Sequence, residues 1–207
     1  MTIENISLDS VIIYFEQKIS ESVLNQVQAL SRIVQTLDGI IDITPSYCSI
    51  LVTYDCAIYD AKSIQKAVWN SKKLLNTMRE TPSTISRSKV VKIPTNYSDN
   101  LDLERVATHN NLTIEEVITL HSQQIYRVYA IGFMVGFAYL AQLDSKIETP
   151  RLSTPRAKIP KGSVAIADRQ TAIYPQDSAG GWNIIGRTSF NGFEQFSIGD
   201  YVQFTRL

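Results

Sequence analysis

Hydrophobic positions in roughly the first ninety residues alternate between the two-residue period of strands and the longer period of helices. The elements expected from this pattern are, in chain order, strand 11–15, helix 22–37, strands 40–44 and 47–54, helix 61–78 and strand 88–93. The order β-α-β-β-α-β predicts a ferredoxin-like α/β domain over residues 1–93. That fold hosts many functions, so it does not name one.

The segment after this domain predicts a pair of short helices. Residues 81–88 are small and polar and predict a loop. Helices are expected over 102–110 and 113–123, the second of them opened by a Thr-Glu capping box. We do not interpret the pair as DNA-binding, because Glu115 and Glu116 begin the second helix and DNA phosphates would repel them. A packed helical linker is the better interpretation.

From residue 125 onward the hydrophobic positions return to the period of strands. Beyond Gly132, short apolar runs are separated by glycine and proline, and no long helical period appears after Tyr139. This pattern predicts a small β-barrel or sandwich. The fold class expected for the whole chain is α+β, in which the N-terminal domain is followed by a helical linker and a β-barrel domain over residues 94–207.

The charge balance excludes recognition through a global electrostatic field. The 207 residues carry 20 Lys and Arg against 20 Asp and Glu, so no attraction to nucleic acid or an anionic membrane is expected. No stretch approaches the ~18 apolar residues of a membrane span, and the N-terminus has no basic region followed by an apolar run. We therefore expect a soluble, cytoplasmic protein in which Cys48 and Cys56 are reduced core thiols.

The common catalytic motifs are absent from the sequence. It has no phosphate loop, no dinucleotide-binding glycine motif, no HExxH and no GxSxG. His109 and His121 are the only histidines, too few for a histidine-rich metal site, so we expect no metal and no cofactor bound by a recognisable motif. His121 could serve as a general base, although a lone histidine is more often structural.

Positive charge gathers locally between residues 146 and 169. Six cations stand there against two anions, and the pairs Pro150-Arg151 and Pro155-Arg156 repeat at an interval of five. Proline stiffens the backbone, and a preorganised guanidinium suits carboxylate or phosphate. A solvated charged face would look the same in the sequence.

Two glycine-containing groups follow the basic segment. Gly180-Gly181-Trp182 permits close backbone approach to a ligand, and Gly186-Arg187-Thr188 adds a charge and a hydroxyl. Two β-turns with Trp182 in the core would explain the same residues. We interpret residues 132–188 as the functional part of the chain, presenting basic loops to an anionic ligand or a partner.

Motifs along the whole chain resemble one known family. They read, in order, PSYCSILVTYD, ERVA, EEVITLHSQQIYRV, GFMVGFAYL, PRLSTPR, KGSVAIADRQTAIYP, SAGGWNIIGRT and IGDYVQF. So many ordered motifs identify the chain as a member of the family of 5-oxoprolinase B subunits, also called KipI and allophanate hydrolase subunit 1.

The resemblance implies a fold, an activity and partners. It implies a C-terminal cyclophilin-like β-barrel and a complex with the C and A subunits of 5-oxoprolinase that opens 5-oxoproline to glutamate, with ATP as a co-substrate of the complex. It implies His121 and Arg187 among the site residues, and we expect both to be catalytic. His121 is the candidate for proton transfer, and Arg151, Arg156 or Arg187 suits the stabilisation of negative charge on the lactam oxygen. The substrate-binding residues it implies are Arg151, Arg156, Gln170, Tyr174, Gly180, Gly181, Trp182 and Thr188.

Two alternatives to a role as a subunit of 5-oxoprolinase remain open. Some relatives instead inhibit the autophosphorylation of a sensor histidine kinase. This regulatory role gains support because Val135 and Ala179 replace prolines that are usual in the family. A carboxyltransferase-like part of a urea-processing enzyme shares the same motifs and has no further feature in its favour.

Overall fold

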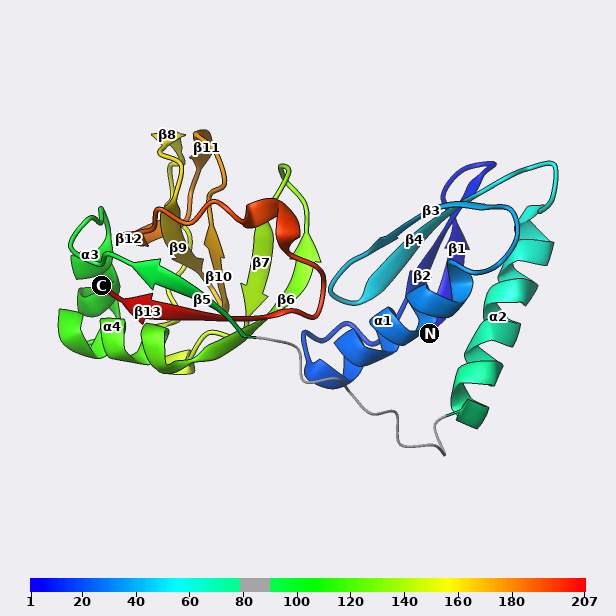
Figure 1. Cartoon of the computed structure of the whole chain (residues 1–207), viewed down its shortest axis with the longest axis horizontal. Helices are drawn as coiled ribbons and strands as arrows, with labels where there is room; N and C mark the ends of the chain where they lie inside the picture. The colour runs from blue at the N-terminus through cyan, green and yellow to red at the C-terminus, as the bar shows by residue number, and fades with distance from the viewer. Residues whose placement is uncertain (79–89) are drawn as a thin grey trace. The chain divides into compact units, whose positions relative to one another are not determined.

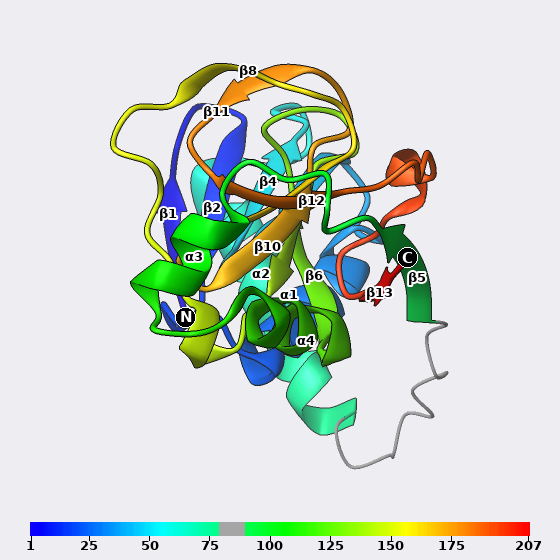
Figure 2. The same ribbon diagram turned by 90° about the vertical axis from the view of Figure 1, so that its left-hand side faces the viewer.

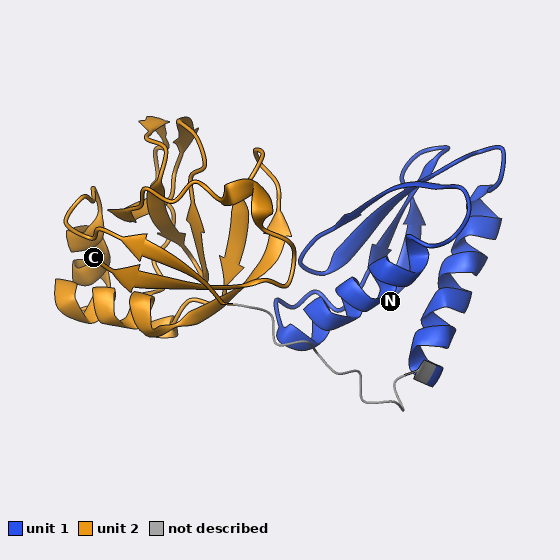
Figure 3. Ribbon diagram, viewed as in Figure 1, with its two compact units in different colours: residues 1–87 blue, residues 88–207 orange. Residues whose placement is uncertain are grey.

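The structure is a computed structural model that describes residues 1–78 and 90–207 (Figure 1). The chain forms two compact units, residues 1–87 and 88–207 (Figure 3). The loop predicted over residues 81–88 lies outside the described residues. No helix in the described part of the chain is long and apolar enough to cross a membrane.

The first unit is a four-stranded antiparallel sheet packed against two helices. Its strands lie in the order β1 (Thr2–Asn5), β2 (Ser10–Tyr14), β4 (Ser49–Tyr54) and β3 (Ile40–Pro45). The helices are α1 (Glu21–Val34) and α2 (Ala61–Met78). Alternate residues of β2 and β4 are buried and join the buried stripes of both helices in one core. The two predicted helices and three of the predicted strands are therefore present.

The predicted ferredoxin-like arrangement is not confirmed, because its last strand lies in the other unit. Strand β5 (Val90–Thr95) pairs in parallel with β13 (Tyr201–Arg206). The place beside β2 that a fourth strand would take is held by β1. Hydrophobic alternation shows which face of a strand is buried but does not identify its neighbour. The polar sequence of β1, Thr-Ile-Glu-Asn, predicts no strand.

The second unit is built on a seven-stranded sheet that nearly closes into a barrel. Its strands lie in the order β12 (Asn183–Arg187), β9 (Ser163–Ala167), β10 (Gln170–Ile173), β7 (Ala138–Ala141), β6 (Ile125–Ile131), β13 and β5. Backbone hydrogen bonds of 2.7 and 2.9 Å between Asn96 and Arg187 join the two ends of this sheet. The prediction of a small, barrel-like sheet in this unit is confirmed.

Short elements cover the two ends of the barrel strands. Helices α3 (Leu103–His109) and α4 (Ile114–Gln123) were both predicted, and α4 begins with the expected capping box. A two-stranded ribbon is formed by β8 (Arg156–Ile159) and β11 (Ser178–Gly180). This ribbon and α4 lie at opposite ends of β9 and β10 (Figures 1 and 2). Two 3-10 turns, Ser145–Ile147 and Phe193–Gln195, complete the unit.

Strand β9 separates two clusters in the core of the second unit. Val164 and Ile166 join the large cluster that includes α3 and α4, whereas Ala165 and Ala167 face the other way. The small alanine side chains leave room for bulky aromatic rings on their face of the sheet, and those rings lie near the β8–β11 ribbon.

The two cysteines lie in the first unit and are both free. Cys48 is half-buried in the core, as expected, whereas Cys56 is exposed. The prediction of a core thiol is therefore wrong for Cys56, because that residue falls in the turn after β4 rather than within the strand.

Candidate functional site

An aromatic cluster, formed by Phe137, Tyr139, Tyr174 and Trp182, lies on the alanine face of the barrel. The ring of Phe137 is at its centre, 4.8 Å from Tyr139, 5.3 Å from Tyr174 and 5.9 Å from Trp182 between centroids. The exposed guanidinium of Arg151 lies 5.6 Å from the centroid of the Trp182 ring. A cation at this distance is attracted to the face of an indole. The cluster therefore carries a positive charge at its edge.

Gly180 and Gly181 bring the backbone close to this cluster. A Cβ atom at Gly180 would lie 2.3 Å from the Tyr174 hydroxyl, so only glycine fits there without displacing the ring. The Gly181 carbonyl accepts a hydrogen bond of 2.7 Å from Leu152 N and so holds the loop that carries Arg151. Burial raises the pKa of Tyr174 to about 12, so its phenol stays protonated at neutral pH.

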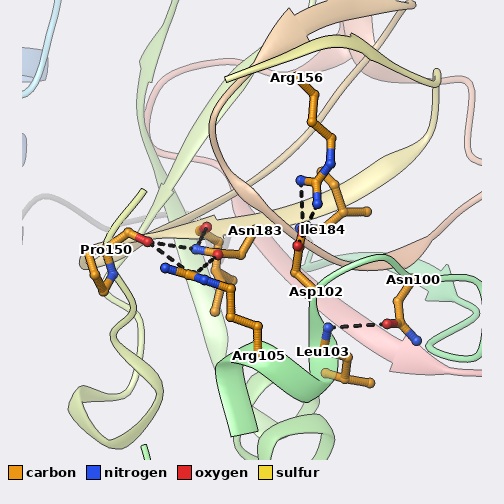
Figure 4. Close-up of polar contacts among 9 residues, drawn as sticks. Asn100, Asp102, Leu103, Arg105, Pro150, Arg156, Asn183 and Ile184 are labelled. Carbon is orange, nitrogen blue, oxygen red and sulfur yellow. Dashed lines mark hydrogen bonds and ion pairs between the residues drawn. The ribbon is translucent and has the colours of Figure 1, made fainter. Parts of the chain in front are cut away.

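Arg156 is engaged by a buried carboxylate rather than open to a ligand. Its Nη1 and Nη2 lie 2.9 and 2.6 Å from the two carboxylate oxygens of Asp102, whose side chain is only 5% exposed (Figure 4). Asp102 Oδ2 also accepts a hydrogen bond of 2.7 Å from Ile184 N. These contacts join the start of β8 to the start of α3 and to β12. This geometry gives Arg156 a positioning role.

Arg187 and Thr188 lie at the other end of β12 and line a separate, open surface depression of about 540 Å³ with Lys161. Arg187 Nη1 is 3.4 Å from Asp99 Oδ2, and both side chains are about half exposed. Such a pair is weak because water screens it. Arg187 follows Asn183 by four residues, about 13 Å along a strand, so this depression and the aromatic cluster are different places.

His121 is fully buried, and its ring packs against Tyr126 and Phe204 of the large core cluster. Its Nδ1 is 2.7 Å from the Tyr97 hydroxyl, and its Nε2 is 2.9 Å from Thr171 Oγ1. The Thr171 hydroxyl itself donates to the Ala165 carbonyl, so His121 Nε2 must carry the proton and Nδ1 must accept from Tyr97. This series of hydrogen bonds describes a neutral imidazole that joins α4 to β10 and to the loop after β5.

The buried imidazole predicts that the second unit loses stability in mild acid. Burial lowers the pKa of His121 to about 3, against about 6.5 in an unfolded chain, so folding favours the neutral form. The contribution of neutral His121 to the free energy of unfolding is present above pH 6.5. Below that pH the free energy of unfolding falls by about 1.4 kcal/mol per pH unit. Between pH 7 and 5 the free energy of unfolding should fall by about 2 kcal/mol, as measured by urea denaturation.

Two histidine variants control this measurement. His121→Gln removes the titrating group, so its free energy of unfolding should change much less over the same pH range. His109→Gln replaces the exposed histidine of α3 and should keep the pH dependence of the parent protein. A pH dependence that survives in His121→Gln would contradict this interpretation of His121.

The structure brings together only part of the predicted site. Arg151, Tyr174, Gly180, Gly181 and Trp182 meet at the aromatic cluster. The remaining predicted residues lie elsewhere: Arg156 on Asp102, Arg187 and Thr188 at the open depression, His121 in the large core cluster, and Gln170 at the start of β10 opposite Ala141 and Ala167.

The sequence-based prediction omitted residues that the tertiary structure places in the aromatic cluster or in contact with the loop of residues 150–156. They are Asp102, Arg105, Phe137, Tyr139 and Asn183. Asp102 is the N-cap residue of α3, and its sequence position predicts a cap, yet its side chain makes no capping bond. Asn100 Oδ1 accepts from Leu103 N instead, at 3.2 Å, which leaves the Asp102 carboxylate for Arg156 (Figure 4). Within residues 1–78 and 90–207, no group of three or more His, Cys, Asp or Glu could hold a metal ion.

Comparison with known proteins places the whole chain in one family. The family described as carboxyltransferase domain, subdomain C and D, matches residues 1–198. A Bacillus subtilis protein, named as the B subunit of 5-oxoprolinase, is 33% identical over 99% of this chain and 92% of its own length. A Haemophilus influenzae protein of the same name is 32% identical over 99% of this chain and 97% of its own.

A solved structure agrees with these sequence matches. The crystal structure of TTHA0988 superposes with a TM-score of 0.78 at 30% identity and covers 97% of this chain. This chain spans only 40% of the TTHA0988 chain. The resemblance drawn from the ordered motifs is thereby confirmed, and the protein belongs to the carboxyltransferase domain C and D family that includes the 5-oxoprolinase B subunits.

Proposed function

We propose that this chain is the B subunit of an ATP-dependent 5-oxoprolinase and that it is inactive without the C and A subunits. The proposal is supported by two relatives named as 5-oxoprolinase B subunits, which match this chain over nearly its full length. The sequence has no phosphate loop, so ATP enters the proposal as a co-substrate of the complex and is assigned to no residue here. We also interpret the barrel of the second unit as cyclophilin-like, as the family resemblance implies.

The observation that carries the substrate site is the position of Arg151 over Trp182. Arg151 makes no ion pair within the described part of the chain, so its guanidinium can donate hydrogen bonds to a ligand carboxylate. 5-Oxoproline carries one carboxylate on a small lactam ring. In this proposal Arg151 pairs with that carboxylate, and the lactam ring lies at the edge of the aromatic cluster, where Tyr139 is partly exposed while Trp182 is buried beneath Arg151.

Ring opening breaks the lactam C–N bond. Water adds to the carbonyl carbon, negative charge develops on the lactam oxygen, and the nitrogen takes a proton as it leaves, which gives glutamate. Donors aimed at that oxygen would lower the barrier. Arg187 lies at a different depression, and His121 has both ring nitrogens engaged in the core, so neither contacts a ligand bound at Arg151 unless the chain rearranges. Their catalytic roles remain separate proposals.

The test is reconstitution of the complex. Co-expression with the A and C subunits should give ATP-dependent formation of glutamate from 5-oxoproline. Arg151→Ala should raise the KM for 5-oxoproline by about 10- to 100-fold, because a charge-assisted hydrogen bond contributes about 1.5–3 kcal/mol. The control is Arg169→Ala, which removes an exposed arginine of the same unit that pairs with Glu148, and its KM should equal that of the parent complex.

Three outcomes would count against parts of the proposal. No turnover, in a complex shown to be assembled, would contradict the enzyme function. An unchanged KM in Arg151→Ala would show that 5-oxoproline does not bind beside Arg151 and Trp182. Arg187→Ala in the same complex tests the predicted catalytic arginine, and an unchanged kcat would remove Arg187 from that role.

One exposed turn suits a partner protein, which the regulatory alternative and the enzyme complex both require. The turn between β6 and β7 presents Phe133 and Val135 to solvent, with 63% and 77% of their surfaces exposed. Phe133 also adopts a φ of 72°, which is rare for a bulky residue. An exposed apolar turn of this kind suits contact with another protein, whether another component of the oxoprolinase complex or a histidine kinase. Inhibition of kinase autophosphorylation by a chain whose assembled complex shows no turnover would support the alternative.

A further inference from the structure

The loop that carries Arg151 is held at its start by two side chains outside the predicted site. The Pro150 carbonyl accepts hydrogen bonds from Asn183 Nδ2 at 3.1 Å and from Arg105 Nη1 at 3.4 Å (Figure 4). Arg105 Nη1 also donates to Asn183 Oδ1, so the three groups form a closed triangle. In this triangle an arginine from α3 and an asparagine from β12 converge on one carbonyl.

Asn183 has only one orientation that satisfies its neighbours. It is fully buried, and its Nδ2 donates both to the Pro150 carbonyl and, at 3.2 Å, to the Ile166 carbonyl. Rotating the amide by half a turn would place its oxygen against two carbonyl oxygens and its nitrogen against the Arg105 guanidinium. The side chain is therefore held rigidly on the barrel and offers a fixed anchor to the loop.

The anchored carbonyl controls where the Arg151 side chain begins. A peptide unit is planar and contains the Cα of the next residue, so fixing the Pro150 carbonyl also fixes the Arg151 Cα. Two further contacts hold the rest of the loop, the Leu152 N–H to the Gly181 carbonyl and Arg156 to Asp102. Each attachment ends on β12 or directly beside it, and Trp182 immediately precedes β12. Strand β12 therefore helps to position both the Arg151 guanidinium and the Trp182 ring that it faces.

We propose that Arg105 and Asn183 are positioning residues for Arg151, and that they set the affinity of the site for the carboxylate of the substrate. This inference rests on the proposed function, because it takes Arg151 as the residue that binds 5-oxoproline. Neither residue need contact the ligand. Loss of the anchor releases the Pro150 carbonyl, and the guanidinium then occupies the position over Trp182 for less of the time, which weakens binding.

The first test is a double-mutant cycle in the assembled complex. Arg105→Met keeps the length of the side chain and removes both hydrogen bonds, so the KM for 5-oxoproline should rise about fivefold with little change in kcat. In an Arg151→Ala background the same substitution should add no further effect on KM, because it acts through Arg151. Arg105→Lys should restore part of the loss. Arg206→Met, which removes an exposed partner of Glu115, should leave the KM unchanged.

The second test does not depend on activity. The sequence has two tryptophans, so a Trp69→Phe background leaves Trp182 as the sole tryptophan emitter in the isolated chain. Arg151→Ala should alter the Trp182 emission, because a cation leaves the face of the ring. Arg105→Met should alter it in the same direction, and the double variant should match Arg151→Ala alone.

The two tests separate the failure of this inference from the failure of the proposed function. If the assembled complex shows no turnover, the proposed function fails and the emission cycle still decides whether Arg105 positions Arg151. If the complex is active but the effects of Arg105→Met and Arg151→Ala add, the positioning role is overturned while the function stands. Parent-like emission of Arg105→Met would also overturn it.

Discussion

Gly162→Ala is expected to lower the free energy of unfolding of the second unit by about 3 kcal/mol. Gly162 has a φ of 82°, a conformation that costs an L-residue about 1–2 kcal/mol. An added Cβ would also lie 2.2 Å from the Thr188 carbonyl oxygen, a backbone atom that cannot rotate away. The Gly162 backbone connects residues that flank β9, β10 and β12, because its N–H donates to the Tyr174 carbonyl and its carbonyl accepts from Thr188 N, both at 2.8 Å.

The matched control for this substitution is Gly132→Ala. A Cβ at Gly132 meets nothing within 4 Å, so its free energy of unfolding should stay within about 0.5 kcal/mol of the parent. Urea denaturation followed by Trp182 emission, in a Trp69→Phe background, reports the second unit alone because Trp69 lies in the first. Equal stability of the two variants would contradict the close approach of Gly162 to Thr188.

Asp102→Ala is expected to destabilise the second unit by about 3 kcal/mol. The carboxylate is almost completely buried and accepts three hydrogen bonds, two from Arg156 and one from Ile184 N. Its removal leaves a buried N–H without a partner and a partly buried guanidinium without its counterion. Asp102→Asn keeps the shape and one acceptor oxygen, so it should recover part of this loss.

Asp99→Ala is the control on the same loop. Its carboxylate is about half exposed and lies 3.4 Å from Arg187, so its loss should change the free energy of unfolding by less than about 0.5 kcal/mol. The same Trp182-monitored urea denaturation compares the three variants. A small effect of Asp102→Ala, similar to that of Asp99→Ala, would show that the pair with Arg156 does not hold α3 and β8 to the barrel.

The spacing of hydrophobic residues along the chain was sufficient to predict most of the helices and strands. The sequence predicted a helix over 61–78, which is the observed extent of α2, and the capping box of α4. These signals are local, because a helix stripe or a cap involves residues within a few positions of one another. Strand pairing is not local, which is why β5 was assigned to the wrong unit while its own position was nearly right.

The structure brings together only some of the residues of the predicted site. The sequence alone determined that residues 132–188 gather arginines, glycines and Trp182, and the ordered motifs determined the family. Tertiary structure decided which of those residues meet: it placed Arg151 over Trp182, turned Arg156 toward Asp102 and buried His121 in the core. The reason is physical. A residue type sets the chemistry that a side chain can perform, but whether it faces a ligand, a counterion or the core depends on segments far away in the chain that fold against it.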